Sequence, residues 1–318
     1  MEKFNEVGVF GSRYGQPPEG YSLLRELSAG HPKTIESFFR EVDVVNVVGG
    51  DGTLQWVFGQ LIGMNHQGLV VVEKGGGANT FYHGIQGTNP VEEYPFKDRF
   101  SSDQYKVYHY RPPVARWADS ELVLSYLAGN APVSVITEKW KEFFGRLPGM
   151  KRVVTENAAF FYNLGGVGAL LSVAPLISKE PKSLALIFTE DGENYQRLTG
   201  PLMAAEIIAV PAYGPYGLNI EIPPDKLCLL ELGEDSQWEL FKKSACGFKE
   251  ITRFSQEGFQ RLIDLGLINT RIIVRARVLP NYWMRNNTSF SGELMTMDKS
   301  YTVERAESGL WVAIKRDE

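Results

Sequence analysis

Three glycine-rich segments carry the residue types and spacing that are best suited to chemistry in this sequence. They span residues 11–15, 49–53 and 75–81, and each follows a short apolar run. Glycine lets backbone N–H groups approach an anion closely, and the N-terminus of a following helix adds partial positive charge. The three segments therefore predict a phosphate-binding site that is built largely from the backbone.

The middle segment, Gly49-Gly50-Asp51-Gly52-Thr53, also contains an acid. A carboxylate would repel a phosphate, so Asp51 fits such a site if it holds Mg2+, directly or through water, or faces an incoming hydroxyl group. Thr53 would cap the following helix or donate a hydrogen bond to a phosphate. The plainer alternative is a tight strand-to-helix turn in which Asp51 is only a helix cap.

Familiar phosphate and metal signatures are missing from the sequence. There is no GxxxxGKS/T motif, and no GxGxxG follows the first apolar run, which excludes the P-loop and dinucleotide fingerprints. The histidines are scattered without the spacing of metal ligands, which argues against a zinc site. The predicted phosphate site is therefore of another kind.

The elements that would position these segments alternate between strand and helix at the start of the chain. Apolar runs at residues 7–10, 42–48 and 69–72 predict strands, and helical spacing follows the first two. Strands that alternate with helices indicate a parallel sheet with right-handed crossovers. Ligands bind beyond the carboxyl ends of such strands, where the glycine segments would lie. Residues 87–111 are more polar and predict a loop.

The rest of the chain holds mostly short β-type runs, which predict antiparallel strands. The runs are 122–127, 132–136, 158–164, 184–189, 207–211, 227–232, 271–278 and 311–314, and helices are expected at 138–146 and 256–265. We therefore predict an α/β fold with an N-terminal Rossmann-like parallel-sheet domain over residues 1–112. A C-terminal, mainly antiparallel β-sandwich domain would span residues 113–299. Residues 300–318 would pack back on the first domain, with a cleft between the two lobes.

Four stretches carry a family resemblance: VVNVVGGDGTLQWVFGQL, VVVEKGGGANTFYHGI, AEIIAVPAYGPYGLNIEIPPDKLCLLELG and NTSFSGELMTMDKSYTVE. The first resembles the nucleotide loop of the diacylglycerol kinase catalytic-domain superfamily, and the second resembles its next loop, in which Asn79 and Phe81 match. That superfamily includes bacterial diacylglycerol kinases, sphingosine kinases and ceramide kinases, with NAD kinases as remoter relatives. The third stretch is similar to its metal-linked loop, and the fourth to the turn that carries its catalytic glutamate.

The resemblance implies an ATP-dependent lipid kinase that uses Mg2+ and transfers the γ-phosphate to a hydroxyl of diacylglycerol or of a sphingoid- or ceramide-like lipid. It implies Asp51 and Glu293 as catalytic residues, and Asp51 and Asp225 as metal ligands. The implied nucleotide-binding residues lie in the three glycine segments: Gly11, Ser12, Arg13, Gly15, Gly49, Gly50, Gly52, Thr53, Gly76, Gly77 and Asn79. Taken without the family, Glu293 is a hairpin residue that faces water and Asp225 is a turn residue.

Several positions depart from the family pattern. The first loop reads FGSRYG where the family has Asn-Pro-x-Ser-Gly, Gly77 replaces a threonine, and Thr80 replaces an aspartate. Lys226 replaces a glycine, and Ser291 replaces the aspartate that precedes the Gly-Glu pair. These departures support an alternative hypothesis, a catalytically inactive nucleotide- or lipid-binding homologue. A NAD kinase or another soluble-metabolite kinase, which shares the GGDGT motif, is a further alternative.

A second Asp-Gly-Glu sequence, Asp191-Gly192-Glu193, matches the family's late motif better than Ser291-Gly292-Glu293 does. It lies too early in the chain, so we interpret it as a surface turn. The sequence therefore predicts that only the later glutamate belongs to the site.

Composition limits the partners and the location. The net charge of -5 argues against general nucleic-acid binding. Two cysteines, Cys228 and Cys246, cannot form a disulfide framework, which favours a reducing cytosol, and Cys228 is expected in the core. The uncharged stretch 157–178 contains glycines and a proline, and predicts a buried strand, turn and helix rather than a membrane span. A lipid substrate would then require peripheral membrane contact. The oligomeric state is left open, a homodimer included.

Overall fold

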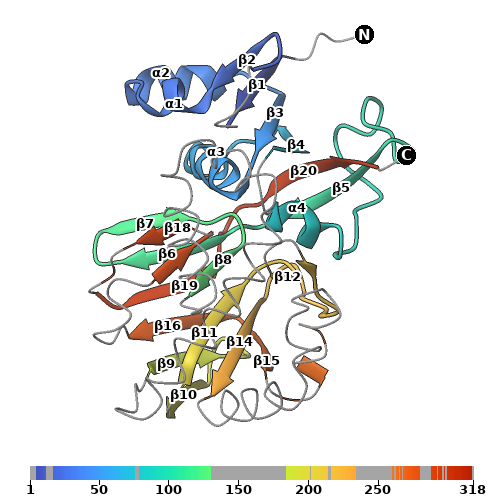
Figure 1. Cartoon of the computed structure of the whole chain (residues 1–318). Coiled ribbons are helices and arrows are strands. Elements are labelled where there is room, and N and C mark those ends of the chain that lie inside the picture. The colour runs from blue at the N-terminus through green and yellow to red at the C-terminus, as the bar shows by residue number, and fades with distance from the viewer. Residues whose placement is uncertain are drawn as a thin grey trace, which may run out of the picture.

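A six-stranded sheet organises the first lobe of the computed structural model (Figure 1). The structure describes residues 5–11, 17–75, 79–129, 184–200, 202–213, 216–233, 268–279, 288–291, 293–295 and 299–316, and also 260, 263, 264, 266 and 297. The sheet has the order β2-β1-β3-β4-β20-β5, with β5 antiparallel to β20 and the other pairs parallel. Its strands are β1 (Glu6–Phe10), β2 (Tyr21–Leu23), β3 (Val44–Gly49), β4 (Leu69–Lys74), β5 (Tyr105–Tyr110) and β20 (Leu310–Lys315).

Among the described residues, four helices accompany this sheet: α1 (Leu24–Ser28), α2 (Pro32–Phe39), α3 (Asp51–Gly63) and α4 (Thr80–Ile85). Alternate valines of β3 divide between the two faces of the sheet. Val45 and Val47 join the large core that includes α3, whereas Val44 joins a smaller core under Tyr94 and Phe100. Since both faces are covered, the strand is almost continuously apolar, as parallel strands usually are.

Two antiparallel sheets form the second lobe. The second sheet has the order β10-β9-β16-β19-β6-β7, and the third has the order β15-β14-β11-β8-β17-β18. The strands of the second sheet are β6 (Pro113–Trp117), β7 (Ser120–Val123), β9 (Leu184–Thr189), β10 (Tyr195–Gly200), β16 (Arg275–Leu279) and β19 (Tyr301–Arg305). Those of the third are β8 (Leu127–Gly129), β11 (Leu202–Ile208), β14 (Leu227–Gly233), β15 (Asn269–Ile273), β17 (Thr288–Phe290) and β18 (Glu293–Met295). A short ribbon, β12 (Ala212–Tyr213) with β13 (Tyr216–Gly217), completes the lobe.

The two antiparallel sheets pack face to face through aromatic side chains. Phe290 of β17 stacks on Trp117 of β6 with 6.1 Å between ring centroids, and meets the Tyr301 ring of β19 edge-on at 5.2 Å. The predicted α/β fold, with a Rossmann-like first domain and a β-rich second one, is therefore confirmed. The domain boundaries and the cleft stay predictions.

The predicted loop over residues 87–111 is wrong in part, because β5 lies within it. This strand pairs with β20, about two hundred positions later in the chain, through the register Tyr110 to Leu310. Its residues, YKVYHY, alternate and are partly polar, so the partner strand decides the structure. The predicted run 271–278 is likewise two strands, since the chain leaves the third sheet at Val274 and enters the second.

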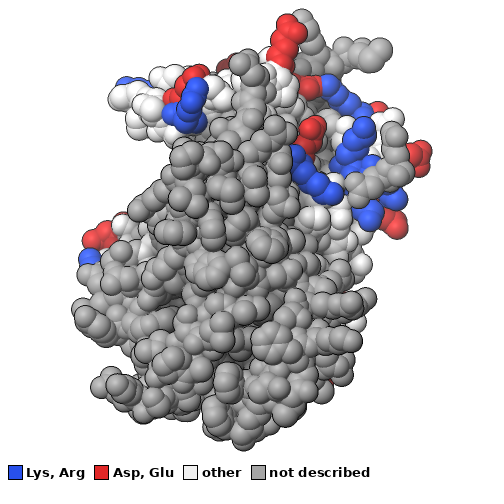
Figure 2. Space-filling view, in the orientation of Figure 1, with Lys and Arg blue, Asp and Glu red and all other residues white. Residues whose placement is uncertain are grey.

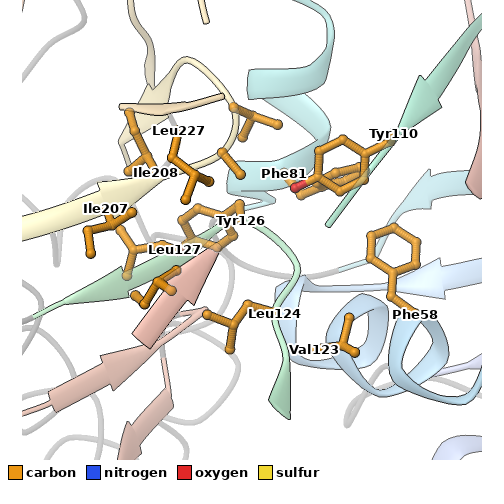
Figure 3. Close-up of a cluster of buried hydrophobic side chains, with 14 of the residues drawn as sticks. Phe58, Phe81, Tyr110, Val123, Leu124, Tyr126, Leu127, Ile207, Ile208 and Leu227 are labelled. Atoms are coloured by element: carbon orange, nitrogen blue, oxygen red, sulfur yellow. The ribbon is translucent and has the colours of Figure 1, made fainter. Parts of the chain in front are cut away.

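One continuous hydrophobic core joins the lobes (Figure 3). Phe58 of α3, Phe81 of α4 and Tyr110 of β5 come from the first lobe, and Leu124 and Tyr126 lie at the start of the second. Cys228 is buried in β14, as expected, and burial raises the pKa of its thiol to about 12. Within the described residues, no helix is both long and apolar enough to cross a bilayer.

Candidate active site

Three glycines meet at the carboxyl ends of β1, β3 and β4. A Cβ on Gly11 would lie 1.8 Å from the Thr53 hydroxyl oxygen, and a Cβ on Gly49 would lie 2.5 Å from the same atom. A Cβ on Gly75 would lie 2.5 Å from the backbone nitrogen of Gly49. These distances are below any normal contact, so only glycine fits while Thr53 fills the space between the strand ends. Thr53, which is 5% exposed, is therefore a packing residue in this structure.

The N-terminus of α3 opens beside these glycines. Gly50 is the N-cap residue and has no side chain to cap the helix, and Gly50, Asp51 and Gly52 are each half-buried. The helix is 13 residues long, so its aligned peptide dipoles place partial positive charge at this turn. First-turn N–H groups have no partner within a helix, which suits the turn to an anion.

The Asp51 carboxylate is held by the backbone of the next loop. One oxygen accepts a hydrogen bond from Thr80 N at 3.0 Å, and the other accepts one from Phe81 N at 2.9 Å. Asp51 therefore caps α4 and ties the loop between β4 and α4 to the glycine turn. A contact with Mg2+ would have to use the lone pairs that these amides leave over.

Lys74 is a site residue that sequence reasoning missed. It lies directly opposite Gly49 in the pairing of β3 and β4, is exposed, and places its ammonium 4.7 Å from the centroid of the Tyr82 ring. Figure 2 shows other basic side chains, with acidic ones among them, over the part of the first lobe where β5 and β20 lie. The signal in the sequence was a lysine immediately before a glycine run. A cation at this position favours a bound phosphate.

Five of the predicted nucleotide-binding residues lie outside the described residues: Ser12, Arg13, Gly15, Gly76 and Gly77. Asn79 is described, is half-buried and adopts the left-handed conformation at φ 50° as the N-cap residue of α4. Asparagine tolerates this conformation better than most residues, which explains its place in the loop. The structure thus brings Gly11, Asp51 and Asn79 to the same edge of the first sheet.

The turn before Glu293 is anchored at the start of the second lobe. Ser291 lies between β17 and β18, is 2% exposed and adopts φ 51°. Its hydroxyl accepts a hydrogen bond from Ser125 N at 2.8 Å, and its own N–H donates to Leu127 O at 2.8 Å. The backbone of Glu293 pairs with Phe290 at the start of β18. The segment that holds this turn directly follows β7, which packs against α3.

Asp225 lies apart, on the exposed turn that precedes β14. The next residue, Lys226, donates its N–H to Pro223 O at 2.9 Å, which closes the turn. Its carbonyl accepts a hydrogen bond from the buried Arg305 at 2.7 Å. The described residues contain no group of three or more His, Cys, Asp or Glu side chains placed to hold a metal. In this part of the chain, the turn of Asp225 is held by hydrogen bonds to protein.

Arg305, which binds the turn of Asp225, is a buried cation between the two lobes and is 7% exposed. Its guanidinium also donates to Arg111 O at 2.7 Å and to Ala209 O at 2.6 Å. Burial lowers the pKa of Arg305, yet an arginine keeps its charge in proteins. Three segments that meet between the lobes are thus tied to one side chain.

The second Asp-Gly-Glu sequence is a surface turn, as predicted. Asp191 accepts hydrogen bonds from Glu193 N at 2.9 Å and from Asn194 N at 2.8 Å, between β9 and β10. These bonds, above all the one from Asn194, hold the pKa of the Asp191 carboxyl well below its usual range. The acid is committed to local structure.

The edge of the first sheet fits a nucleotide phosphate chain better than it fits a bound metal alone. It offers the α3 N-terminus and Lys74 as positive groups, and Thr80 has a buried hydroxyl without a partner among the described residues. The Asp51 carboxylate suits Mg2+ that arrives with phosphates, because Mg2+ usually takes one or two protein carboxylates and phosphate oxygens. Such an ion would screen the phosphate charges.

Comparisons with known proteins point to one fold. No protein-family model matches the sequence, and no curated protein does either. Solved structures do match. A putative diacylglycerol kinase from Bacillus anthracis str. Sterne has a TM-score of 0.58 and 11% identity, and the match covers 98% of this chain and 97% of that one. A diacylglycerol kinase from the same organism has a TM-score of 0.55 and 12% identity over 100% and 99% of the two chains.

The chain has the diacylglycerol kinase fold. A third structure, again of a putative diacylglycerol kinase from that organism, gives a TM-score of 0.56 and 10% identity over nearly the whole of both chains. The shared fold is the one that the resemblance of the sequence motifs implied. At this identity it fixes the architecture, and the chemistry has to be argued from the site itself.

Proposed function

We propose that this protein is an ATP-dependent lipid kinase that transfers the γ-phosphate of ATP to a lipid hydroxyl, as in diacylglycerol or a sphingoid- or ceramide-like lipid. One observation carries the proposal. The glycine turn at the start of α3 lies at the carboxyl edge of the first sheet, with Lys74 beside it, in a fold shared with diacylglycerol kinases. Phosphoryl transfer depends mainly on positioning and charge neutralisation, which such a turn supplies.

Each site residue has a role in the proposed reaction. The turn of Gly49, Gly50 and Gly52 binds the phosphate chain, and Lys74 neutralises part of its charge. Asp51 keeps α4 and Asn79 against that turn through its two amide hydrogen bonds. Mg2+ held by the phosphates, with the Asp51 carboxylate as a further oxygen ligand, would screen the transferred group.

The chemical step needs one base. The lipid hydroxyl oxygen forms a bond to the γ-phosphorus while the bond from that phosphorus to the bridging oxygen of ADP breaks. The hydroxyl proton passes to Glu293, and ADP leaves with the bridging oxygen. Removing a general base usually costs about 10²–10⁴-fold in rate, so we expect a loss of that order for Glu293→Gln.

A second site for the lipid itself is part of the proposal. The apolar stretch 157–178, which could contribute to such a site, lies outside the described residues. Peripheral contact with a membrane follows from the chemistry of the acceptor, since lipids with long chains reside in bilayers. Assembly as a homodimer is an independent proposal that size-exclusion chromatography with light scattering would test.

The test is transfer of radiolabelled γ-phosphate from Mg-ATP to a panel of diacylglycerol, sphingoid base, ceramide, NAD and other soluble alcohols. The wild type should label a lipid. Asp51→Ala, which leaves two amides without their acceptor, should lower the rate at least 100-fold, in the range seen when preorganised groups are removed. Asp191→Ala is the matched control, because Asp191 also accepts backbone amides but lies in a surface turn, and should stay within twofold.

The variant Asp51→Asn separates two roles for this residue. Its oxygen still accepts one amide hydrogen bond, while its NH2 group faces the second backbone N–H, so a purely structural Asp51 should lose less rate than in Asp51→Ala and keep its Mg2+ requirement. A metal-contacting Asp51 should require a higher Mg2+ concentration for half-maximal rate. Labelling of NAD alone would select a soluble-metabolite kinase, and nucleotide binding without any transfer would select an inactive homologue; either result contradicts the lipid kinase.

A further inference from the structure

A row of contacts runs across the lobe junction between the two candidate catalytic residues. It begins at Asp51 in the first lobe and ends at the turn of Glu293 in the second. We infer that Tyr110 and Ser291 are positioning residues, which set the Glu293 turn against the glycine turn through the backbone of Ser125. The inference rests on the proposed function, and it names residues that the sequence motifs did not single out for this role.

The first contact is the anchoring of the Glu293 turn. Ser291 holds Ser125 N through its hydroxyl, and its own N–H binds Leu127 O, both at 2.8 Å. Ser291 is buried and adopts φ 51°, a conformation that few residues other than glycine and asparagine accept readily. The backbone at this point is therefore fixed from two sides, two residues before Glu293.

The second contact is made by Tyr110, at the end of β5 in the first sheet. Its phenol donates to Ser125 O at 2.6 Å, so Ser125 is held through its N–H by one lobe and through its carbonyl by the other. Burial raises the pKa of the Tyr110 phenol, which keeps it protonated and able to donate at neutral pH. The link between β7 and β8 thus has little freedom.

The third contact leads back to the glycine turn. The rings of Tyr110 and Phe81 meet edge-on with 4.9 Å between centroids, and Figure 3 shows them lying against one another. The Phe58 ring of α3 packs on both, with 5.2 Å between its centroid and that of Phe81 and 5.9 Å to that of Tyr110. The Phe81 N–H donates to the Asp51 carboxylate at 2.9 Å. A shift of Tyr110 would therefore reach both helices that carry the candidate phosphate site.

Two other buried residues can separate the effect of the hydroxyl groups from the effect of packing. Tyr108 lies on the same strand and Ser289 lies two residues before Ser291, and both are buried. Neither hydroxyl has a partner among the described residues. They provide matched controls, because removing either hydroxyl changes a buried side chain of the same type without breaking a hydrogen bond to a described residue.

The kinetic experiment compares Tyr110→Phe with Tyr108→Phe, and Ser291→Ala with Ser289→Ala, in the lipid kinase assay. We expect the first member of each pair to lower kcat about tenfold with the KM for ATP within twofold. The lost hydroxyl releases the Glu293 turn, whereas the ring packing of Phe58, Phe81 and Tyr110 still holds the glycine turn. Ser291→Asn should restore most of the rate, since asparagine accepts φ near 51° and supplies an acceptor oxygen. Equal kcat values within each pair would overturn the inference.

A second measurement does not depend on turnover. Amide hydrogen exchange of the wild type and of Ser291→Ala should show at least tenfold faster exchange at Ser125 and measurably faster exchange in Thr80–Ile85. Ser289→Ala should leave both unchanged. If no lipid is labelled by the wild type, the proposed function fails. The exchange result then decides by itself whether Ser291 and Tyr110 hold Ser125 and couple it to α4. Unchanged exchange at Ser125 and in α4 would overturn it.

Discussion

The two ends of the parallel strands in the first sheet differ in what they leave available. At the amino ends, α2 and the end of α3 border a hollow of about 1110 Å³, lined in part by Asp43, His66 and Gly68. The His66 ring there is bound at both nitrogens: His66 Nε2 lies 2.7 Å from Val42 O, and His66 Nδ1 accepts from Gly68 N at 2.9 Å. At the carboxyl ends, the α3 N-terminus is half-buried and Lys74 is exposed.

The comparison of the two ends indicates that the size of a hollow is a poor guide to the binding site in this fold. The amino end is spacious, but both ring nitrogens of its histidine are bound to protein. The carboxyl end is crowded at Gly11, Gly49 and Gly75, and that crowding holds the turn at the helix N-terminus in place. An anion needs positioned donors more than volume, and the carboxyl end provides them.

The largest expected effect comes from adding a methyl group at the crowded carboxyl end. In Gly75→Ala, the new Cβ would lie 2.5 Å from Gly49 N and 2.8 Å from Gly49 Cα, so backbone has to move. We expect a loss of about 1–3 kcal/mol in the free energy of unfolding, as for other overpacked sites. Nucleotide affinity should fall at least tenfold. Urea denaturation and titration with Mg-ATP measure the two quantities.

The matched variant at the amino end is Gly68→Ala. Its Cβ would lie 2.2 Å from His66 Cε1 and 2.5 Å from Asp43 O, so a similar loss of stability is expected. Its nucleotide affinity should stay within twofold. Gly63→Ala, which meets nothing within 4 Å, should leave both quantities nearly unchanged. Loss of nucleotide affinity in Gly68→Ala but not in Gly75→Ala would reverse the comparison.

The smallest expected effect is a pH dependence at the amino end. Burial lowers the pKa of His66, and its Nδ1 accepts the Gly68 N–H, which requires the neutral ring. As pH falls below the unfolded value of about 6.5, the unfolded chain takes up a proton that the folded chain resists, so stability decreases until the folded pKa is passed. Urea denaturation between pH 7.5 and 5.5 should show this decrease for the wild type. His66→Gln should show a smaller one, and identical slopes would contradict this account.

The elements of the first lobe follow largely from local sequence pattern. The valine-rich runs predicted β3 and β4, because strands that are covered on both faces are almost wholly apolar. The GGDGT motif predicted the start of α3, because packing at the strand ends leaves room only for glycine at Gly49. The glycines of this turn are required both for packing and for the proposed phosphate contacts, and so the sequence alone could predict the turn.

The contacts between distant segments could not be predicted in this way. Ser125 and Ser291 are 166 positions apart, and nothing in either neighbourhood marks the bond between them. The same holds for Arg305, whose three carbonyl partners come from separate parts of the chain. Asp51 was predicted to hold a metal, to face a hydroxyl group or to cap the helix that follows it. Its acceptor bonds to α4 depend on a loop that pattern alone does not place.

The central claim is that the carboxyl end of the first sheet binds the nucleotide. The most direct measurement is a titration of isotope-labelled protein with Mg-ATP, followed through its backbone amide resonances. The account predicts that the signals of Gly50, Gly52 and Thr53 move and saturate together, while those of His66 and Gly68 stay in place. Movement confined to His66 and Gly68, or no movement at the glycine turn at saturating nucleotide, would contradict it.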